Sequence, residues 1–218
     1  MEPDRDASHE LSAGSFSGWL DGFLAALQHD VDADVPCGGC TACCTSSQFV
    51  HIEPDETETL AHIPHVLLFP APGRPKGHRL MGYDDEGRCP MLIDGACSIY
   101  EHRPRTCRTY DCRIFPAAGL EPDEQGHAAI AEQARRWRFE HPTDLDQVRH
   151  RAVRAASAFL AAHREVFGDG RGPTNATQLA ALAVELHDVF LTTGGDGRPA
   201  PADPTVAEVE VELGRRHP

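Results

Sequence analysis

The sequence predicts a mainly α protein with a small, irregular α+β cysteine-rich module and a helical C-terminal part. Two observations support this fold class. All eight cysteines of the 218-residue chain lie between positions 37 and 112, in a stretch that prolines and glycines repeatedly interrupt. After residue 116, by contrast, apolar residues recur every three or four positions, which is the period of an amphipathic helix.

The N-terminal part of the chain divides into two segments. Residues 1–16 are largely polar and acidic, which predicts a disordered N-terminus. Residues 17–34 contain the first predicted helix, because Trp19, Phe23 and Leu27 fall on one stripe. The first residues lack the basic and apolar regions of a signal peptide, so we expect a cytoplasmic protein.

Residues 35–116 form the predicted cysteine-cluster metal-binding module. A helix should follow Glu53, because Pro54 suits a first helical position and the acidic residues after it suit the helix dipole. Prolines make residues 70–77 a loop. Three short apolar runs predict strands: QFVHI (48–52), HVLLF (65–69) and HRLMGY (78–83).

Residues 117–191 are predicted to be a helical region that packs on the module. In its first helix, Ile130 and Trp137 fall at helical spacing. Thr143 is suited to cap a second, longer helix, and Asn175 or Thr174 a third helix that runs to Leu191.

Residues 192–218 are predicted to be a flexible C-terminal tail. Their first half, TTGGDGRPAPADP, has the composition of a linker. The segment TVAEVEVELGRR that follows alternates like a strand but carries charges like a terminal helix, so both conformations stay open.

Charge and hydropathy exclude two kinds of partner. The formal net charge of -14 argues against nucleic-acid binding, because the chain offers no general attraction for phosphates. No run of apolar residues approaches the length needed to cross a membrane. We therefore expect a protein or small-molecule partner.

The first cysteine block has the pattern C-x2-C-x2-C-C, at Cys37, Cys40, Cys43 and Cys44. Clustered thiols in a reducing compartment favour metal binding over disulfides. Three cysteines at two-residue gaps are typical of a loop that wraps an iron–sulfur cluster. Because neighbouring side chains diverge, Cys43 and Cys44 should not both bind one metal ion, and one of them should serve a second centre or the surrounding shell.

The second cysteine block contains Cys89, Cys97, Cys107 and Cys112. It has no C-x2-C pair, which counts against a zinc ribbon. Eight thiolates could serve two four-sulfur centres, or one centre with additional redox-active or surrounding cysteines. The expected cofactor is an iron–sulfur cluster of the 4Fe–4S type, with zinc as the alternative.

Histidines could replace cysteines as ligands, but eight cysteines leave no need for them. We therefore interpret the histidines of the module as ordinary surface or core residues. They are His51, His62, His65, His78 and His102.

Together, the two blocks resemble the YkgJ-type cysteine-cluster family of zinc- or iron-chelating domains. The resemblance covers roughly residues 35–116, and Tyr110 stands where phenylalanine is common. The family is often labelled an iron–sulfur oxidoreductase, and flagellin lysine N-methylases are similar to it in their cysteine region. The positions that match the family pattern are Cys37, Cys40, Cys43, Cys44, Cys89, Pro90, Leu92, Cys97, Ile99, Tyr100, Arg103, Pro104, Cys107, Arg108, Tyr110 and Cys112.

Arginines surround the second block although the protein is acidic. They can neutralise a thiolate centre, or bind an anion beside it. Pro104 makes the directions of its neighbours differ, so we expect Arg103 and Arg108, which match the family pattern, to face the cysteines and Arg105 to face solvent. Tyr100 and Tyr110 are expected to pack over the centre, donate to sulfur, or belong to the core.

Three functions are compatible with these motifs. The first is an iron–sulfur protein with a redox or cluster-dependent role, which could be an oxidoreductase. The second is a non-catalytic zinc module that presents its helices to a partner. The third is a methyltransferase-like enzyme acting on a protein lysine, although the sequence has no methyl-donor-binding glycine loop.

Overall fold

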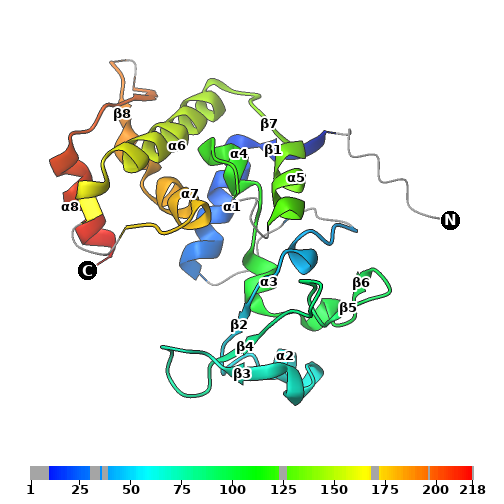
Figure 1. Ribbon diagram of the computed structural model, residues 1–218. Helices are drawn as coiled ribbons and strands as arrows, with labels where there is room; N and C mark the ends of the chain where they lie inside the picture. Colours follow the sequence, from blue (N-terminus) through cyan, green and yellow to red (C-terminus); the bar gives the residue numbers. More distant parts are fainter. Residues whose placement is uncertain are drawn as a thin grey trace. The chain divides into compact units, whose positions relative to one another are not determined.

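A computed structural model describes most of the chain (Figure 1). The described residues are 10–29, 35, 39–122, 127–167, 172–195 and 197–217. Among them, no helix is both long enough and apolar enough to cross a membrane.

The chain forms two compact units, which are considered separately below. The helical unit consists of Met1–Leu24, Cys112–Asp123 and Glu132–Pro218. The cysteine unit consists of Ala25–Asp111 and Glu124–Ala131. The boundary falls directly before Cys112, whereas the sequence predicts a module that continues to residue 116.

The helical unit has a strand at residues 11–15, which for that part corrects the prediction of a disordered N-terminus over residues 1–16. Strand β1 (Leu11–Ser15) pairs in parallel with β7 (Trp137–Glu140). Residues 1–9 lie outside the described residues. Trp137 therefore starts a strand directly after helix α5 (Ala128–Arg136), instead of continuing the helix as its spacing predicts.

Caps define where the main helices start. Thr143 forms a capping box with Asp146, and Asn175 accepts a hydrogen bond from the backbone N–H of Gln178, so both predicted caps are confirmed. Asp146 also accepts a hydrogen bond from the backbone N–H of Ser17 at 2.9 Å, close to the start of the first helix.

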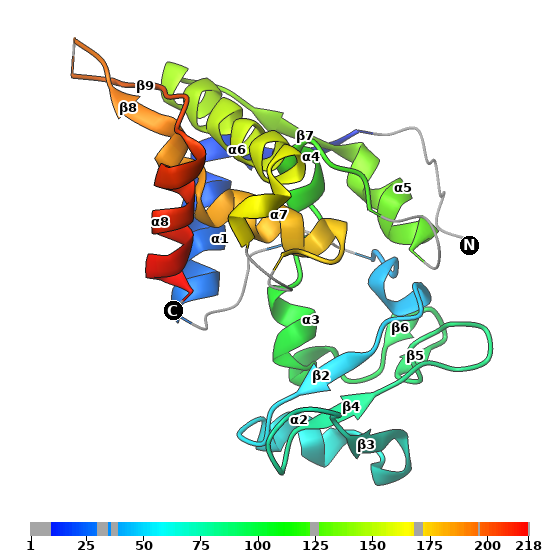
Figure 2. The ribbon, with the colours of Figure 1, turned by 60° about the vertical axis from the view of Figure 1, so that its left-hand side comes forward.

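Figure 2 shows α7 crossing α6, and the two helices contact each other. The helices are α1 (Phe16–His29), α4 (Ile114–Ala118), α6 (Asp144–Ala162) and α7 (Ala176–Glu185), with 3-10 turns η4 (Arg164–Phe167) and η5 (His187–Phe190).

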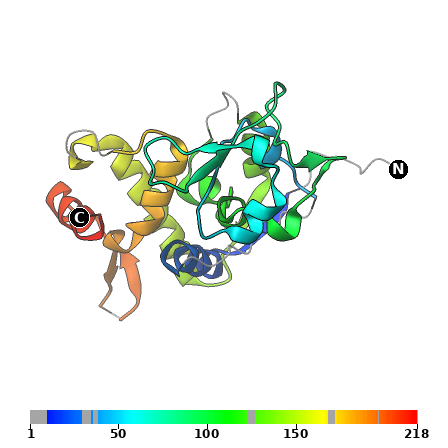
Figure 3. The same ribbon diagram turned by 90° about the horizontal axis from the view of Figure 1, so that it is seen from below.

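The C-terminal segment is folded, and the prediction of a flexible tail over residues 192–218 is wrong. Strands β8 (Leu191–Thr193) and β9 (Pro199–Pro201) form an antiparallel hairpin, visible beside the last helix in Figure 3. Helix α8 (Val206–Arg216) starts at a capping box made by Thr205. Its buried residues belong to the core of the helical unit, which contains Ala152, Ala156, Leu160, Val166, Phe167, Ala183, Leu186, Phe190, Val209 and Leu213.

The cysteine unit contains the three predicted strands as one antiparallel sheet in the order β2-β4-β3. The central strand pairs Met81 with Val50 on one side and with Leu68 on the other. The helix predicted after Glu53 is confirmed as α2. The bounds are β2 (Val50–Ile52), α2 (Thr57–His62), β3 (Leu68–Pro70) and β4 (Arg79–Met81).

Short elements with many turns complete the cysteine unit. A small apolar core lies under them, and two cysteines, Cys89 and Cys97, pack against it. The core residues are Val50, Ile52, Ile63, Met81, Met91 and Ile99. The additional elements are η1 (Cys43–Thr45), η2 (His65–Leu67), β5 (Leu92–Ile93), β6 (Ala96–Cys97), η3 (Tyr100–His102) and α3 (Arg105–Thr109).

A histidine of α6 should make the helical unit sensitive to acid. The His150 ring stacks on Phe16 at 4.2 Å and shares a 2.8 Å hydrogen bond with the His141 ring. Burial lowers the pKa of His150 to about 4, and the charges of His141 and Arg154 act in the same direction. The folded protein thus keeps this ring neutral at pH values where the unfolded chain protonates it.

We expect the unfolding free energy to decrease as the pH falls from about 6.5 towards 4. His150 is partly open to solvent, so its share should be about 1–2 kcal/mol. Both tryptophans, Trp19 and Trp137, lie in the helical unit, so their fluorescence during urea unfolding can measure the effect. His150→Gln should lose less stability than the natural protein between pH 7 and pH 5. An equal loss in both proteins would contradict this prediction.

Candidate metal centre

The first cysteine block enters the described part of the chain at a tight turn. Cys37 lies outside the described residues. Cys40 and Cys44 are half-buried, whereas Cys43 is exposed. Cys43 and Cys44 both belong to the single 3-10 turn η1, where Thr45 N–H donates to the carbonyl of Ala42 at 3.2 Å. The two adjacent cysteines therefore differ in environment.

A backbone hydrogen bond joins the two cysteine blocks. The N–H of Cys89 donates to the carbonyl of Cys44 at 2.7 Å. Burial raises the pKa of the Cys89 thiol, while backbone hydrogen bonds from Met91 and Leu92 oppose that shift. Pro90 has a fixed φ that suits the turn in which the N–H of Leu92 donates to the carbonyl of Cys89 at 2.9 Å. This turn brings the amides of Met91 and Leu92 near the Cys89 sulfur. Such donors stabilise a thiolate, which is the form that binds metal.

The other two thiols of the group come from separate elements. Cys97 lies in β6, paired with Leu92 of β5. Cys107 lies in α3, two residues after the helix begins at Arg105. Four thiols of this unit therefore come from four different pieces of backbone: Cys44 from η1, Cys89 from the turn before β5, Cys97 from β6 and Cys107 from α3.

Electrostatics show which thiols lie near one another. Burial raises the pKa of Cys44 to about 11, and the nearby thiols of Cys89, Cys97 and Cys40 add to the shift. Burial raises the pKa of Cys107 to about 12, although part of this residue is open to solvent, and Cys89, Cys44 and Cys97 again add to it. These thiols are therefore protonated at neutral pH until a cation displaces their protons.

The spacing of these sulfurs bears on which metal suits them. Among the residues that the structure describes, no three cysteine sulfurs lie within 4.8 Å of one another. A single zinc ion with Zn–S bonds of about 2.3 Å brings its sulfurs to roughly 3.8 Å from each other. In an iron–sulfur cluster each cysteine binds a different iron, so the sulfurs stand further apart. For this centre, an iron–sulfur cluster and a zinc ion therefore both stay predictions.

Cys112, the last of the eight predicted ligands, belongs to the helical unit. It is 6% exposed, and its sulfur accepts a hydrogen bond from Trp137 Nε1 at 3.2 Å. The structure thus brings Cys40, Cys44, Cys89, Cys97 and Cys107 near one another within the cysteine unit. Metal ligation stays a prediction for all eight cysteines.

The arginines differ from the prediction at one position. The charge of Arg103 opposes the rise that burial causes in the pKa of Cys107. Its guanidinium stacks over the Tyr100 ring, 4.1 Å from the ring centroid. Arg105 does not point into solvent as predicted, because it forms salt bridges with Glu53 at 2.7 Å and Asp55 at 3.0 Å. The contacts expected of Arg108 and Tyr110 with the centre stay predictions.

The side chain of Glu56, which the sequence patterns did not indicate, is a buried carboxylate and is 7% exposed. Its two oxygens accept hydrogen bonds from the backbone N–H of Glu53 at 2.8 Å and of Arg105 at 2.6 Å. The side chain therefore ties the start of α2 to the start of α3, the helix that carries Cys107. Among the acids DETE, only burial distinguishes Glu56, and no local pattern indicates it.

Fold and thiols together define a metal-binding cysteine-cluster domain. Residues 36–134 match the family model CxxCxxCC, described as a "Putative zinc- or iron-chelating domain". The match covers less than half of the chain and agrees with the family resemblance of the cysteine motifs. Comparison with curated proteins and with solved structures gave no match.

Proposed function

We propose that the thiols of the cysteine unit hold an iron–sulfur cluster of the 4Fe–4S type and that the protein has a redox or cluster-dependent role. The observation that carries the proposal is the grouping of the thiols: Cys44 and Cys107 each lie close enough to Cys89 and Cys97 for these thiols to raise their pKa. A three-cysteine loop at two-residue gaps, typical of iron–sulfur proteins, precedes this group in the sequence. Cys44, Cys89, Cys97 and Cys107 supply the four-thiolate set that such a cluster needs.

When bound, a cluster of this kind supplies one-electron transfer. The residues of the chain hold and tune it. The amides of Met91 and Leu92 stabilise negative charge at Cys89, and the guanidinium of Arg103 does so at Cys107. A reducing, cytoplasmic setting would keep the thiols available, and the partner would be a protein or a small molecule.

The second candidate is a structural zinc module that mediates partner binding. The family description includes zinc, and the small apolar core of the cysteine unit would gain order from any metal. A lysine methyltransferase-like activity is the third candidate, and it rests on the resemblance of the cysteine motifs alone.

Anaerobic purification followed by metal analysis distinguishes these candidates. The expected result is a brown protein that contains iron and acid-labile sulfide, with broad absorption near roughly 400 nm. Exposure of the same sample to air should bleach the colour. A colourless protein with stoichiometric zinc and no iron, purified under the same conditions, would exclude the iron–sulfur proposal in favour of the zinc module.

A further inference from the structure

We propose that Glu58, His62 and His102 form a second metal site, which binds a divalent ion of the Zn²⁺ class without using the thiols. Each residue offers one ligand atom, and these atoms all lie within 4.8 Å of one another. Two imidazoles and one carboxylate are a common ligand set for borderline transition metals. The sequence patterns predict only ordinary roles for the two histidines.

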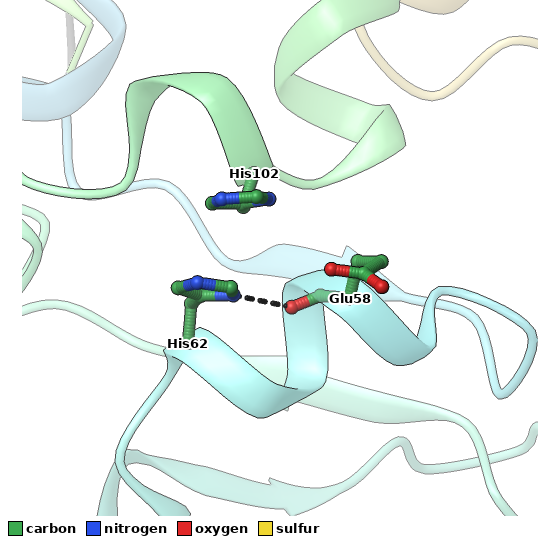
Figure 4. A group of neighbouring side chains, drawn as sticks. All are labelled: Glu58, His62 and His102. Carbon is green, nitrogen blue, oxygen red and sulfur yellow. Dashed lines mark hydrogen bonds between the residues drawn. The ribbon is translucent and has the colours of Figure 1, made fainter.

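Local structure brings the three side chains together. Glu58 and His62 are four residues apart on α2, so they lie on the same face of the helix. His102 ends the 3-10 turn η3, which contacts α2. Figure 4 shows the His102 ring over the His62 ring, with the Glu58 carboxylate beside them. All three residues belong to the cysteine unit.

The tautomer of His62 suits metal binding. Its Nδ1 lies 2.8 Å from the backbone carbonyl oxygen of Glu58 (Figure 4). Because a carbonyl oxygen only accepts hydrogen bonds, Nδ1 carries the proton, and the neutral ring keeps its lone pair on Nε2. An Nδ1–H bond to a carbonyl orients many metal-binding histidines in this way.

Metal binding should open the ring stack. The centroids of His62 and His102 are 3.7 Å apart and the ring planes differ by 11°. The lone pair of each imidazole nitrogen lies in the plane of its ring. In two parallel rings these lone pairs do not point at a common centre, so the His62 or the His102 ring must turn before a nitrogen of each can bind the same ion. The His102 ring has no hydrogen-bond partner within the described part of the chain, and it is only half-buried, so it can turn.

The site is open to solvent and leaves room for further ligands. Glu58 and His62 are exposed, and Glu58 and His102 also line a surface pocket of about 460 Å³. Three protein ligands leave one or more coordination positions free, which water or a small anion would fill. The inference does not depend on which metal the thiols hold.

Zinc titration of the full chain, already carrying its thiol-bound metal, tests this site. Calorimetry should show that the natural protein takes up one more Zn²⁺ than the double variant His62→Gln/His102→Gln. Glu58→Gln should weaken the additional binding at least about 10-fold, since even the loss of an outer-shell partner costs that much. His65→Gln, at an exposed histidine of η2, is the matched control and should bind like the natural protein.

Two spectroscopic measurements locate the ion. Added Co²⁺ should give no sulfur-to-metal charge-transfer band, and Zn²⁺ should shift the NMR signals of the His62 and His102 rings but not those of His65. The proposal is overturned if the natural protein takes up no additional ion, if the double variant binds it equally well, or if the Co²⁺ spectrum shows thiolate ligation. Because all four substituted side chains are exposed or half-buried, circular dichroism should confirm that the variants are folded.

Discussion

Cys107→Ser is expected to release the bound metal and unfold the cysteine unit, while the helical unit stays folded. The strands of the cysteine unit have two or three residues each, and its core contains few large apolar side chains. Ligation by thiols from four separate backbone pieces should therefore supply much of its order. Serine offers no thiolate, and α3 would lose its link to the other ligands. The helical unit retains its own core around Leu160 and Leu186.

Limited proteolysis with mass spectrometry measures this effect directly. In Cys107→Ser, new cleavage sites should appear between residues 39 and 111, and tryptophan fluorescence from Trp19 and Trp137 should stay native. Glu101→Ala, at an exposed acid of the same unit, is the control and should keep the protection around Cys107. Unchanged protection in Cys107→Ser would show that the unit folds without its metal.

Glu56→Ala should strongly destabilise the cysteine unit. It leaves the backbone N–H groups of Glu53 and Arg105 without their carboxylate acceptor. Each hydrogen bond to a charged group contributes about 1.5–3 kcal/mol, so the total loss should be about 3 kcal/mol or more. Because Arg105 starts the helix that carries Cys107, metal affinity should fall together with stability.

Urea unfolding of the metal-loaded protein, followed by circular dichroism, gives the stability change, and competition with a chelator gives the change in metal affinity. Glu56→Gln keeps one oxygen acceptor, so its unfolding free energy should lie between those of the natural protein and of Glu56→Ala. Glu101→Ala, an exposed acid of the same unit, should change the unfolding free energy by less than about 0.5 kcal/mol. If Glu56→Ala were as stable as Glu101→Ala, the tie between α2 and α3 would have no energetic role.

Local patterns predicted many elements correctly. The three strands, α2 and the caps at Thr143 and Asn175 depend on apolar runs, on Pro54 and on capping side chains, all within a few residues of the element they define. The errors occurred where distant packing overrides the local pattern. Trp137 has helical spacing, but pairing with β1 makes it the start of a strand.

For the metal centre, the sequence by itself determined the resemblance to a cysteine-cluster family, the cysteine positions and the expectation of metal binding, because ligand types at fixed spacings constrain the chemistry. Only the tertiary structure decided which thiols share one environment, that Val209 and Leu213 bury the C-terminal helix in a core, and that Arg105 bonds to acids. The tertiary structure likewise decided that His102 lies beside Glu58 and His62 of α2. These features join residues far apart in the chain, and packing of the whole unit sets the distances between them.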